Sequence, residues 1–536
     1  MHISTPLVDF DEGRIDALFE HLDQQRLPGA AVGIALGGRP VYRKGFGLAS
    51  MELPVPLSPT MRMRIFSGTK QFTCLACLLL CEQGRANIDD PIGKYIPELH
   101  PASRGATIRQ LMGHISGLRD SKDIILQFSG TGRCVSSAEL LSLYEYIDDV
   151  NFSPGTSWCY NNGGYLMLTV AIERIARQRF EQVLSELIFQ PLGMHDTLVR
   201  RWDTDFVPNS ATLHMMGAAG TYDRSYLGIA SAGEGGIVST VDDMLRWLAH
   251  MDNPVIGSKA TWEFIATPQR LVNGTSTGYG AGLMRQTYRG ITTLQHPGGG
   301  MGGNCQVLKV PAACLDVVIM VNRSDILASN LAERVLDACL VGLEPSRAQA
   351  STPRISGTFH SPKTGRVVHL FQKNGEQLAS IDALDIPVLA DDAGVLRPAP
   401  PFSYLHTSLQ PTGAVDEPTE IRLIEFGNVD HLERACRPER AETICGRYHS
   451  KSTATQATIF ETDTGPMLRT VGRFGAACFT LQHLAAGIWR SAAVPAVPLG
   501  GILSFDRDGS GFRFSSSRTR GLIFHRVGST PMACSR

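Results

Sequence analysis

A seven-residue motif occurs twice in the second half of the chain. ISGTFHS, residues 355–361, returns as ICGRYHS, residues 444–450, with isoleucine, glycine, an aromatic residue, histidine and serine in the same places. Each copy begins a segment of short alternating strands separated by Gly, Pro and Asp turns, as in EIRLIEF at residues 420–426. Two consecutive units of about 90 residues with this texture predict two related antiparallel β-barrel domains.

The part of the chain before these repeats combines strands with longer helical patterns. Residues 30–47 and 304–322 each predict a pair of strands joined by a short turn. Between them, residues 163–178 and 239–251 carry the apolar spacing of helices. Strands at both ends with helices between them predict an α+β fold, in which an antiparallel sheet has flanking helices and a separate helical region.

The change from helical patterns to short alternating strands occurs in a polar, proline-bearing stretch at residues 344–354, which is typical of a linker. We therefore divide the chain of 536 residues into three expected domains. They are an α+β domain at residues 1–343, a first β-barrel domain at residues 344–440 and a second at residues 441–536.

A serine and a lysine stand three residues apart at Ser67 and Lys70, and a leucine-rich run follows them. If a helix begins at about Ser67, this spacing places the hydroxyl and the amine side by side. An apolar surround disfavours the ammonium form, so burial would turn Lys70 into a base for Ser67. Backbone N–H groups at a helix N-terminus would stabilise a developing oxyanion. Taken alone, the motif also fits an ordinary surface lysine, because Ser-x-x-Lys occurs often by chance.

Two further motifs are suited to lining a cleft. Tyr160 and Asn162 stand in a glycine-rich turn before a predicted helix, where a phenol can share a proton with lysine and an amide can hydrogen-bond a peptide-like substrate. His296 precedes Gly298 and Gly299 just before the terminal strands, and glycines let a substrate approach the backbone closely. Taken separately, the first motif also fits a capping turn and the second a flexible connector.

The order of the three motifs is more specific than any one of them. Ser-x-x-Lys near the start, Tyr-x-Asn about 90 residues later and a His-x-Gly triplet before the last strands resemble the penicillin-recognising serine hydrolases, the group of class C β-lactamases and DD-peptidases. The resemblance covers about residues 12–340 and includes TIRQLMGHISGL at residues 107–118. It implies a β-lactamase/transpeptidase-like fold with the active site between the sheet and the helical region.

The resemblance also implies roles for these residues. Ser67 is the expected nucleophile, and Lys70 and Tyr160 are expected to share the proton transfers. The expected substrate-binding residues come from the other two motifs: Asn162, His296, Gly298 and Gly299. Backbone N–H groups of Ser67 and Gly299 are candidate donors to the oxyanion.

The histidine at position 296 carries information about specificity. Many relatives have lysine in this triplet, and its permanent charge suits a substrate that ends in a free carboxylate. Histidine is largely neutral at pH 7. We therefore expect substrates without a carboxylate next to the scissile bond, meaning amides, esters or the N-terminal residues of longer peptides.

Within the family, the two β-rich appendages and the SGTKQFTC context look most like the bacterial D-aminopeptidases. That likeness implies a homodimer and a hydrolase that releases N-terminal D-amino acids from small peptides, amides or esters through an acyl-enzyme. A second hypothesis for the function is a related serine esterase, amidase or β-lactamase-like hydrolase. A third hypothesis is a catalytically inactive receptor for peptides or penicillins, and the intact Ser, Lys, Tyr and His argue against it.

The likeness implies a loop of the last domain that reaches the catalytic cleft and presents an acidic residue to the ammonium of the substrate. The stretch of this chain most similar to that loop, residues 473–489, contains no Asp or Glu. Glu461, Asp463 and Asp506 are the candidate substitutes. Without such a carboxylate, the specificity would have moved toward another amide or an ester.

Composition argues against several other functions. The 50 basic and 51 acidic side chains offer no excess of positive charge to a nucleic acid. No signal peptide or membrane-spanning apolar run is found, so we expect a cytoplasmic protein without membrane contact. The 12 cysteines follow no disulfide-rich spacing. Cys74, Cys77 and Cys81 share one helix face with leucines between them, which favours core packing over metal ligation, so we expect no cofactor and no metal.

Overall fold

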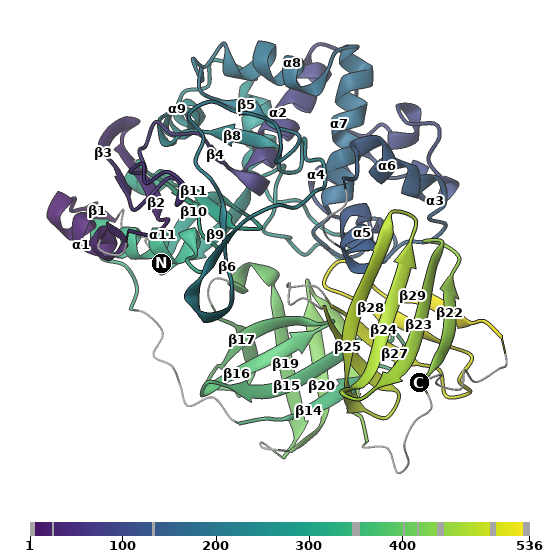
Figure 1. Ribbon diagram of the computed structural model, residues 1–536. Helices are drawn as coiled ribbons and strands as arrows, with labels where there is room; N and C mark the ends of the chain where they lie inside the picture. Colours follow the sequence, from purple (N-terminus) through teal and green to yellow (C-terminus); the bar gives the residue numbers. More distant parts are fainter. Residues whose placement is uncertain are drawn as a thin grey trace.

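Figure 1 shows a domain of sheet and helices that lies beside two β-barrels. The computed structural model describes residues 6–23, 26–130, 134–345, 354–399, 402–414, 417–436, 444–493 and 500–528. A mixed domain followed by two closed antiparallel barrels confirms the predicted fold class.

Six antiparallel strands form the central sheet of the first domain, in the order β3-β2-β12-β11-β10-β9. Their bounds are β2 Ala30–Leu36, β3 Arg39–Phe46, β9 Met284–Tyr288, β10 Ile291–Gly300, β11 Gly303–Val310 and β12 Leu315–Val321. The first strand pair joins the last, since Ile34 on β2 lies opposite Val317 on β12. The two strand pairs that the sequence predicts therefore meet in one sheet.

Alternate residues of β2 enter two different cores, because successive side chains of a strand point to opposite faces. Val32 packs in a cluster with α1 (Glu12–Asp23) and α11 (Ala328–Cys339), which cover one face of the sheet. Ala31 packs in a second cluster, which holds the helical region on the other face. The sheet is thus buried on both sides, which explains its almost continuously apolar strands.

The helices other than α1 and α11 form the region beside the sheet. They are α2 Thr69–Glu82, α3 Pro101–Arg104, α4 Ile108–Met112, α5 Ser121–Ser129, α6 Ser137–Ser142, α7 Asn162–Ala176, α8 Phe180–Leu184, α9 Val241–Asp252 and α10 Lys259–Ala266. α7 ends before Arg177, whose φ of 55° is left-handed. α9 begins after Thr240, whose hydroxyl accepts a hydrogen bond from the backbone N–H of Asp243.

Short strands complete the first domain. They are β1 Leu7–Val8 with β13 Leu340–Val341, β4 Met63–Arg64 with β8 Ile237–Ser239 and β5 Leu198–Val199, and β6 His214–Met216 with β7 Tyr222–Arg224. None of the helices in the described ranges is long and apolar enough to cross a bilayer.

The second half of the chain forms two closed antiparallel barrels. The first consists of β14 Gly357–His360, β15 Val367–Lys373, β16 Glu376–Ile381, β17 Leu384–Ala390, β18 Leu396–Pro398, β19 Thr407–Gly413, β20 Pro418–Glu425 and β21 Asn428–Arg434. The second consists of β22 Gly446–Ser450, β23 Thr455–Thr462, β24 Gly465–Gly472, β25 Gly475–Ala485, β26 Ile488–Ala493, β27 Ile502–Phe505, β28 Gly511–Ser515 and β29 Leu522–Arg526.

The repeated motif supplies the first strand of each barrel, where the barrel closes on its last strand. Phe359 on β14 lies opposite Arg434 on β21, and Tyr448 on β22 lies opposite Arg526 on β29. In each pair the guanidinium lies over the ring, at 5.0 Å and 5.2 Å from the ring centroid. The repeat therefore marks the same closing contact in both barrels.

The second barrel packs on α5 of the first domain (Figure 1). The Phe128 ring of α5 lies 5.0 Å from that of Phe514 and 5.5 Å from that of Phe524, measured between centroids. These aromatic contacts fix the barrel against the helical region.

The predicted domain boundaries stay predictions. Most of the linker, at residues 346–353, lies outside the described residues, and so does the predicted junction at 440/441, which falls within 437–443.

Candidate active site

Ser67 lies in a short 3₁₀ helix, Phe66–Gly68, which leads directly into α2 at Thr69. The continuous helical turn brings Lys70 Nζ to 3.3 Å from Ser67 Oγ. Phe66, immediately before the serine, has a φ of 46° in the left-handed region, which is strained for a non-glycine residue. Its ring occupies the space beside Gly300 on β10, where a Cβ would approach Phe66 to 2.6 Å.

Lys70 is completely buried. Its Nζ lies 2.9 Å from Asn162 Oδ1 and 2.6 Å from the backbone oxygen of Glu234, and both oxygens are acceptors. A neutral amine has two N–H groups and one lone pair. If the two N–H groups donate to these oxygens, the lone pair is left for the Ser67 hydroxyl.

Burial holds the pKa of Lys70 well below its usual value of 10.5. The negative charge of Glu234 opposes this effect, while the positive charges of Arg518 and Lys122 add to it. The same burial that looks costly for a charged lysine therefore favours the neutral amine that a base requires.

Tyr160 and Asn162 flank the lysine from the start of α7. The Tyr160 ring centroid is 4.7 Å from Lys70 Nζ, so the amine faces an aromatic surface. Asn162 contacts the lysine through its side-chain oxygen, while Asn161 caps α7 by accepting a hydrogen bond from the backbone N–H of Gly164. Asn162 thus positions Lys70 in this structure, and its contact with substrate stays a prediction.

His296 is buried on β10 and is held at both ring nitrogens. Nε2 lies 2.9 Å from the Tyr279 hydroxyl, and Nδ1 lies 2.7 Å from the backbone oxygen of Pro297. Burial lowers the pKa of His296 to about 3. The ring is therefore neutral at pH 7, as the sequence predicts for this position.

Gly298 and Gly299 differ in the space that a side chain would have at each position. A Cβ at Gly298 would lie 2.1 Å from the backbone oxygen of Ile65 and 2.8 Å from Cys305 Sγ. β10 therefore contacts the segment that carries the nucleophile through bare backbone. Gly299 is exposed, and a Cβ there would meet nothing closer than 3.9 Å. Gly299 thus leaves room at the site rather than within the core.

Three charged residues that belong to none of the three motifs lie behind the lysine. Asp120 accepts hydrogen bonds from the backbone N–H groups of Lys122, Asn162 and Gly163, so one buried carboxylate joins the starts of α5 and α7. Lys122 forms a buried ion pair with Glu234, whose backbone oxygen accepts from Lys70. Asp120 has the signature of an N-cap in the sequence, but no local pattern indicates the pair.

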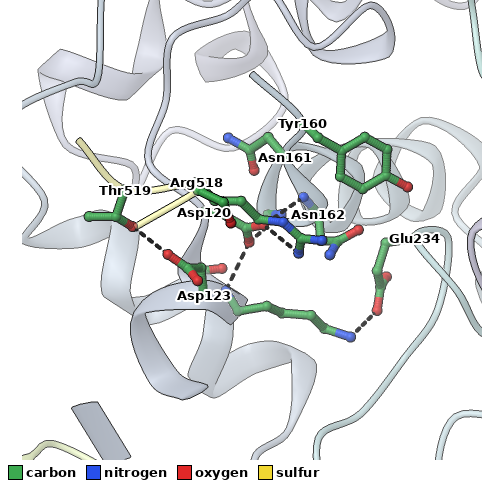
Figure 2. Close-up of polar contacts among 12 residues, drawn as sticks. Asp120, Asp123, Tyr160, Asn161, Asn162, Glu234, Arg518 and Thr519 are labelled. Carbon is green, nitrogen blue, oxygen red and sulfur yellow. Dashed lines mark hydrogen bonds and ion pairs between the residues drawn. The ribbon is translucent and has the colours of Figure 1, made fainter. Parts of the chain in front are cut away.

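The loop between β28 and β29 reaches the same place from the second barrel. Figure 2 shows Arg518 beside Asp120, and Asp123 facing Thr519. Asp123 Oδ2 accepts hydrogen bonds from Ser516 Oγ and Thr519 Oγ1, both at 2.7 Å, so the loop is anchored to α5. Arg518 Nη1 lies 3.5 Å from Asp120 Oδ2, and its guanidinium lies 5.2 Å from the Tyr160 ring centroid.

This loop differs from the one that the sequence indicates. Residues 473–489 form β25 and part of β26, and no residue of that stretch lines the cavity at Ser67. Glu461, Asp463 and Asp506 do not line it either. The described residues of the second barrel that line it are Ser517, Arg518 and Arg520. The segment of the second barrel that reaches the cavity is therefore basic. The sequence did not indicate it, because the residues of a turn between strands do not show which other domain the turn will contact.

A cavity of about 380 Å³ opens at Ser67 between all three domains. The predicted site residues that line it are Ser67, Tyr160, His296, Gly298 and Gly299. The first barrel contributes three charged residues, Arg366, Asp382 and Glu425. Lys70 and Asn162 are not part of the lining. The volume is in the range of small-molecule sites.

The described residues hold no group of three or more His, Cys, Asp and Glu side chains placed to bind a metal ion. Cys74 and Cys77 are buried in the core of the first domain.

Comparison with known proteins adds four similarities, one to a family model, one to a curated protein and two to solved structures. A family model described as Beta-lactamase matches residues 15–340. A D-aminopeptidase from Brucella canis is 27% identical over 366 residues, which cover 66% of this chain and 67% of that protein.

Two solved structures share the fold. The octameric penicillin-binding protein homologue from Pyrococcus abyssi has a TM-score of 0.58 at 20% identity, over 79% of this chain and 100% of that one. The D-amino acid amidase from Ochrobactrum anthropi SV3 has a TM-score of 0.53 at 23% identity, over 61% of this chain and 98% of that one.

Proposed function

Because the chain belongs to the beta-lactamase family, we propose that it is a serine hydrolase that releases N-terminal D-amino acids from small peptides, amides or esters. The observation that carries this proposal is the buried Lys70, whose Nζ lies 3.3 Å from Ser67 Oγ. The D-aminopeptidase that is 27% identical to this chain supports the choice of substrate.

The reaction proceeds through an acyl-enzyme. Neutral Lys70 takes the hydroxyl proton as Ser67 Oγ forms a bond to the substrate carbonyl carbon. The tetrahedral intermediate collapses, the carbon–nitrogen or carbon–oxygen bond breaks, and the leaving group takes the proton through Lys70 and Tyr160. Water then loses a proton to the same base and attacks the ester. The acid is released and Ser67 regains its proton.

The remaining predicted residues orient the substrate. His296 presents a neutral ring, so it offers no permanent cation to a carboxylate next to the scissile bond. The backbone N–H groups of Ser67 and Gly299 are the candidate oxyanion donors. No metal or cofactor takes part in this scheme.

A second candidate is an esterase or amidase whose substrate has no free amine. One observation favours it: the acidic residues that line the cavity, Asp382 and Glu425, are both ion-paired with Arg366. A substrate ammonium would have to compete with that guanidinium. The inactive receptor is the third candidate, and the arrangement of Ser67 and Lys70 argues against it.

A panel of D- and L-amino acid p-nitroanilides, each with its N-acetylated counterpart, separates these candidates. We expect faster hydrolysis of the D-isomers and a loss of rate on acetylation. Equal rates for free and acetylated substrates would favour the second candidate. Covalent labelling by a phosphonate without turnover of any amide or ester would favour the receptor.

The homodimer implied by the resemblance is also part of the proposal. The solved homologue from Pyrococcus abyssi is octameric, so assembly of several copies has a precedent in the fold. Light scattering of the purified chain measures the number of copies directly.

A further inference from the structure

We propose that Arg518 of the second barrel binds a carboxylate of the substrate, so that this hydrolase prefers anionic amides or esters. The inference rests on the proposed serine hydrolase and adds the class of substrate. It follows from how fully each charged side chain in the cavity is compensated by its neighbours.

The charges contributed by the first barrel compensate one another. Arg366 Nε lies 2.7 Å from Asp382 Oδ2, and its two terminal nitrogens face the Glu425 carboxylate. Arg520 Nη2 lies 3.5 Å from the same carboxylate. Burial raises the pKa of Glu425, but the two arginines outweigh it and hold the pKa at about 2. Both carboxylates in the lining are therefore already paired with Arg366.

Arg518 is less well compensated. Among the described residues, the only polar side-chain or backbone group that its guanidinium contacts is Asp120, at 3.5 Å. That carboxylate already accepts three backbone N–H groups, and Asn162 N is closer to the shared oxygen, at 3.0 Å. The Arg518 side chain is 35% exposed and lines the cavity. With this one hydrogen bond, most of its five N–H donors remain available.

The position of Arg518 suits a group on the substrate. Its guanidinium lies over the Tyr160 ring, the same ring lies beside Lys70 Nζ, and Arg518 and Ser67 line one cavity. A planar guanidinium can bind a carboxylate through two parallel N–H···O bonds. Three arginines and two carboxylates line the cavity, and Asp120, the partner of Arg518, lies outside the lining.

The rest of the lining defines the neutral part of the substrate. The apolar side chains in it come from the first domain and the first barrel: Trp158, Met284, Leu327, Ile381, Leu384, Ile386, Leu405 and Phe426. The neutral His296 adds no second cation at β10. The geometry therefore fits an amide or ester with an aromatic or aliphatic body and one carboxylate away from the β10 side.

Two matched substrate pairs test the proposal and locate the carboxylate. The first pair places it on the acyl side: N-succinyl-D-phenylalanine p-nitroanilide and its succinyl methyl ester. The second pair places it on the leaving group: D-phenylalanyl-4-aminobenzoic acid and D-phenylalanyl-4-aminobenzamide. In the wild-type protein we expect a higher kcat/KM for the anionic member of at least one pair.

Arg518→Gln should lower kcat/KM for that anionic substrate by about 10- to 100-fold more than for its neutral partner, the range of a charge-assisted hydrogen bond. Arg518→Lys keeps the positive charge but loses the pair of parallel N–H donors, so its kcat/KM for the anionic substrate should lie between those of the wild type and Arg518→Gln. Arg507→Gln is the matched control, since Arg507 is an exposed arginine of the same barrel outside the cavity. Thermal denaturation verifies that each variant is folded.

Two results would overturn the proposal. One is a preference of the wild-type protein for the neutral member of both pairs. The other is an equal loss for both members in Arg518→Gln, which would mean that Arg518 acts through Asp120 or Lys70 rather than on the substrate.

Calorimetric binding to Ser67→Ala separates this inference from the proposed function. If no substrate is hydrolysed and Ser67 is not labelled by a phosphonate, the proposed function fails. The binding comparison is still decisive in that case. Tighter binding of an anionic member that disappears in Ser67→Ala/Arg518→Gln supports the carboxylate site, and equal binding of both members rejects it.

Discussion

At the scale of single residues, the site depends on two basic groups that burial keeps neutral. Lys70 faces two oxygen acceptors and the Ser67 hydroxyl, and its pKa is held far below that of a solvated lysine. His296 is held between Tyr279 and the backbone oxygen of Pro297. Removing water from both groups turns one into a base and the other into an uncharged neighbour of the substrate.

Replacing the base tests its role directly. Lys70→Ala should lower kcat by about 10²- to 10⁴-fold, because that is the usual cost of losing a general base. Ser67→Ala should abolish turnover with an unchanged circular dichroism spectrum. Hydrolysis that persists in Ser67→Ala would show that another residue is the nucleophile.

The pH dependence of stability tests the buried histidine. The pKa of His296 is about 3 in the folded protein and ordinarily 6.5, so between these values the unfolded chain binds a proton that the folded protein does not. Stability is therefore lost as the pH falls through this window, by up to about 1.4 kcal/mol per pH unit for one such group. We expect urea unfolding of His296→Gln to depend less on pH than that of the wild type between about pH 6 and pH 4. Parallel curves would contradict the assignment.

At the scale of elements, the nucleophile is positioned by the contact of β10 with the 3₁₀ helix before α2. The absence of side chains at Gly298 and Gly300 lets the strand approach Ile65 and the Phe66 ring. Cys305 on the neighbouring strand also contacts the Ile65 backbone oxygen, at 3.0 Å. The serine is thus held by the edge of the sheet as well as by its own helix.

Two neighbouring glycines provide a matched test of this contact. Gly298→Ala would place a Cβ 2.1 Å from the Ile65 backbone oxygen, so the backbone must move and the fold should lose about 1–3 kcal/mol. Gly299→Ala meets nothing closer than 3.9 Å and should unfold at nearly the wild-type temperature. Equal thermal midpoints for the two variants would contradict the packing argument.

At the scale of the whole molecule, the cavity belongs to no single domain. The first domain supplies the serine, the first barrel supplies one apolar and charged wall, and the second barrel supplies the β28–β29 loop. The contacts that hold the second barrel against the first domain include the aromatic contacts of Phe128 and the hydrogen bonds of Asp123. Any motion of that barrel would change the cavity.

Loosening the loop tests this arrangement. Thr519→Val removes a hydrogen bond to the buried Asp123 carboxylate and should cost about 1.5–3 kcal/mol of stability. We also expect a higher KM with a smaller change in kcat, because the loop lines the cavity and does not contact Ser67 Oγ. Thr480→Val, at an exposed position of the same barrel, is the control. An unchanged KM in Thr519→Val would show that the loop position does not influence substrate binding.

Local sequence patterns predicted much of the fold. The repeated motif placed the first strand of each barrel, and the family resemblance of the first domain is confirmed by the matching family model. Ser67 and Lys70 meet because residues three apart on a helical turn are neighbours, whatever surrounds them. Turns, helix periods and strand alternation are short-range properties, so the sequence by itself determined them.

Only the tertiary structure decided which distant groups meet at the cavity. Arg518 and Asp120 lie almost 400 positions apart (|i−j| is 398), and the pairing of Lys122 with Glu234 likewise joins separate segments. The similarity-based choice of residues 473–489 as the reaching loop was wrong, because that stretch forms barrel strands and the turn between β28 and β29 lines the cavity instead. The aim of a surface loop depends on how whole domains pack. Domain packing depends on many weak apolar contacts spread over the interface, and no local sequence motif predicts their combined effect.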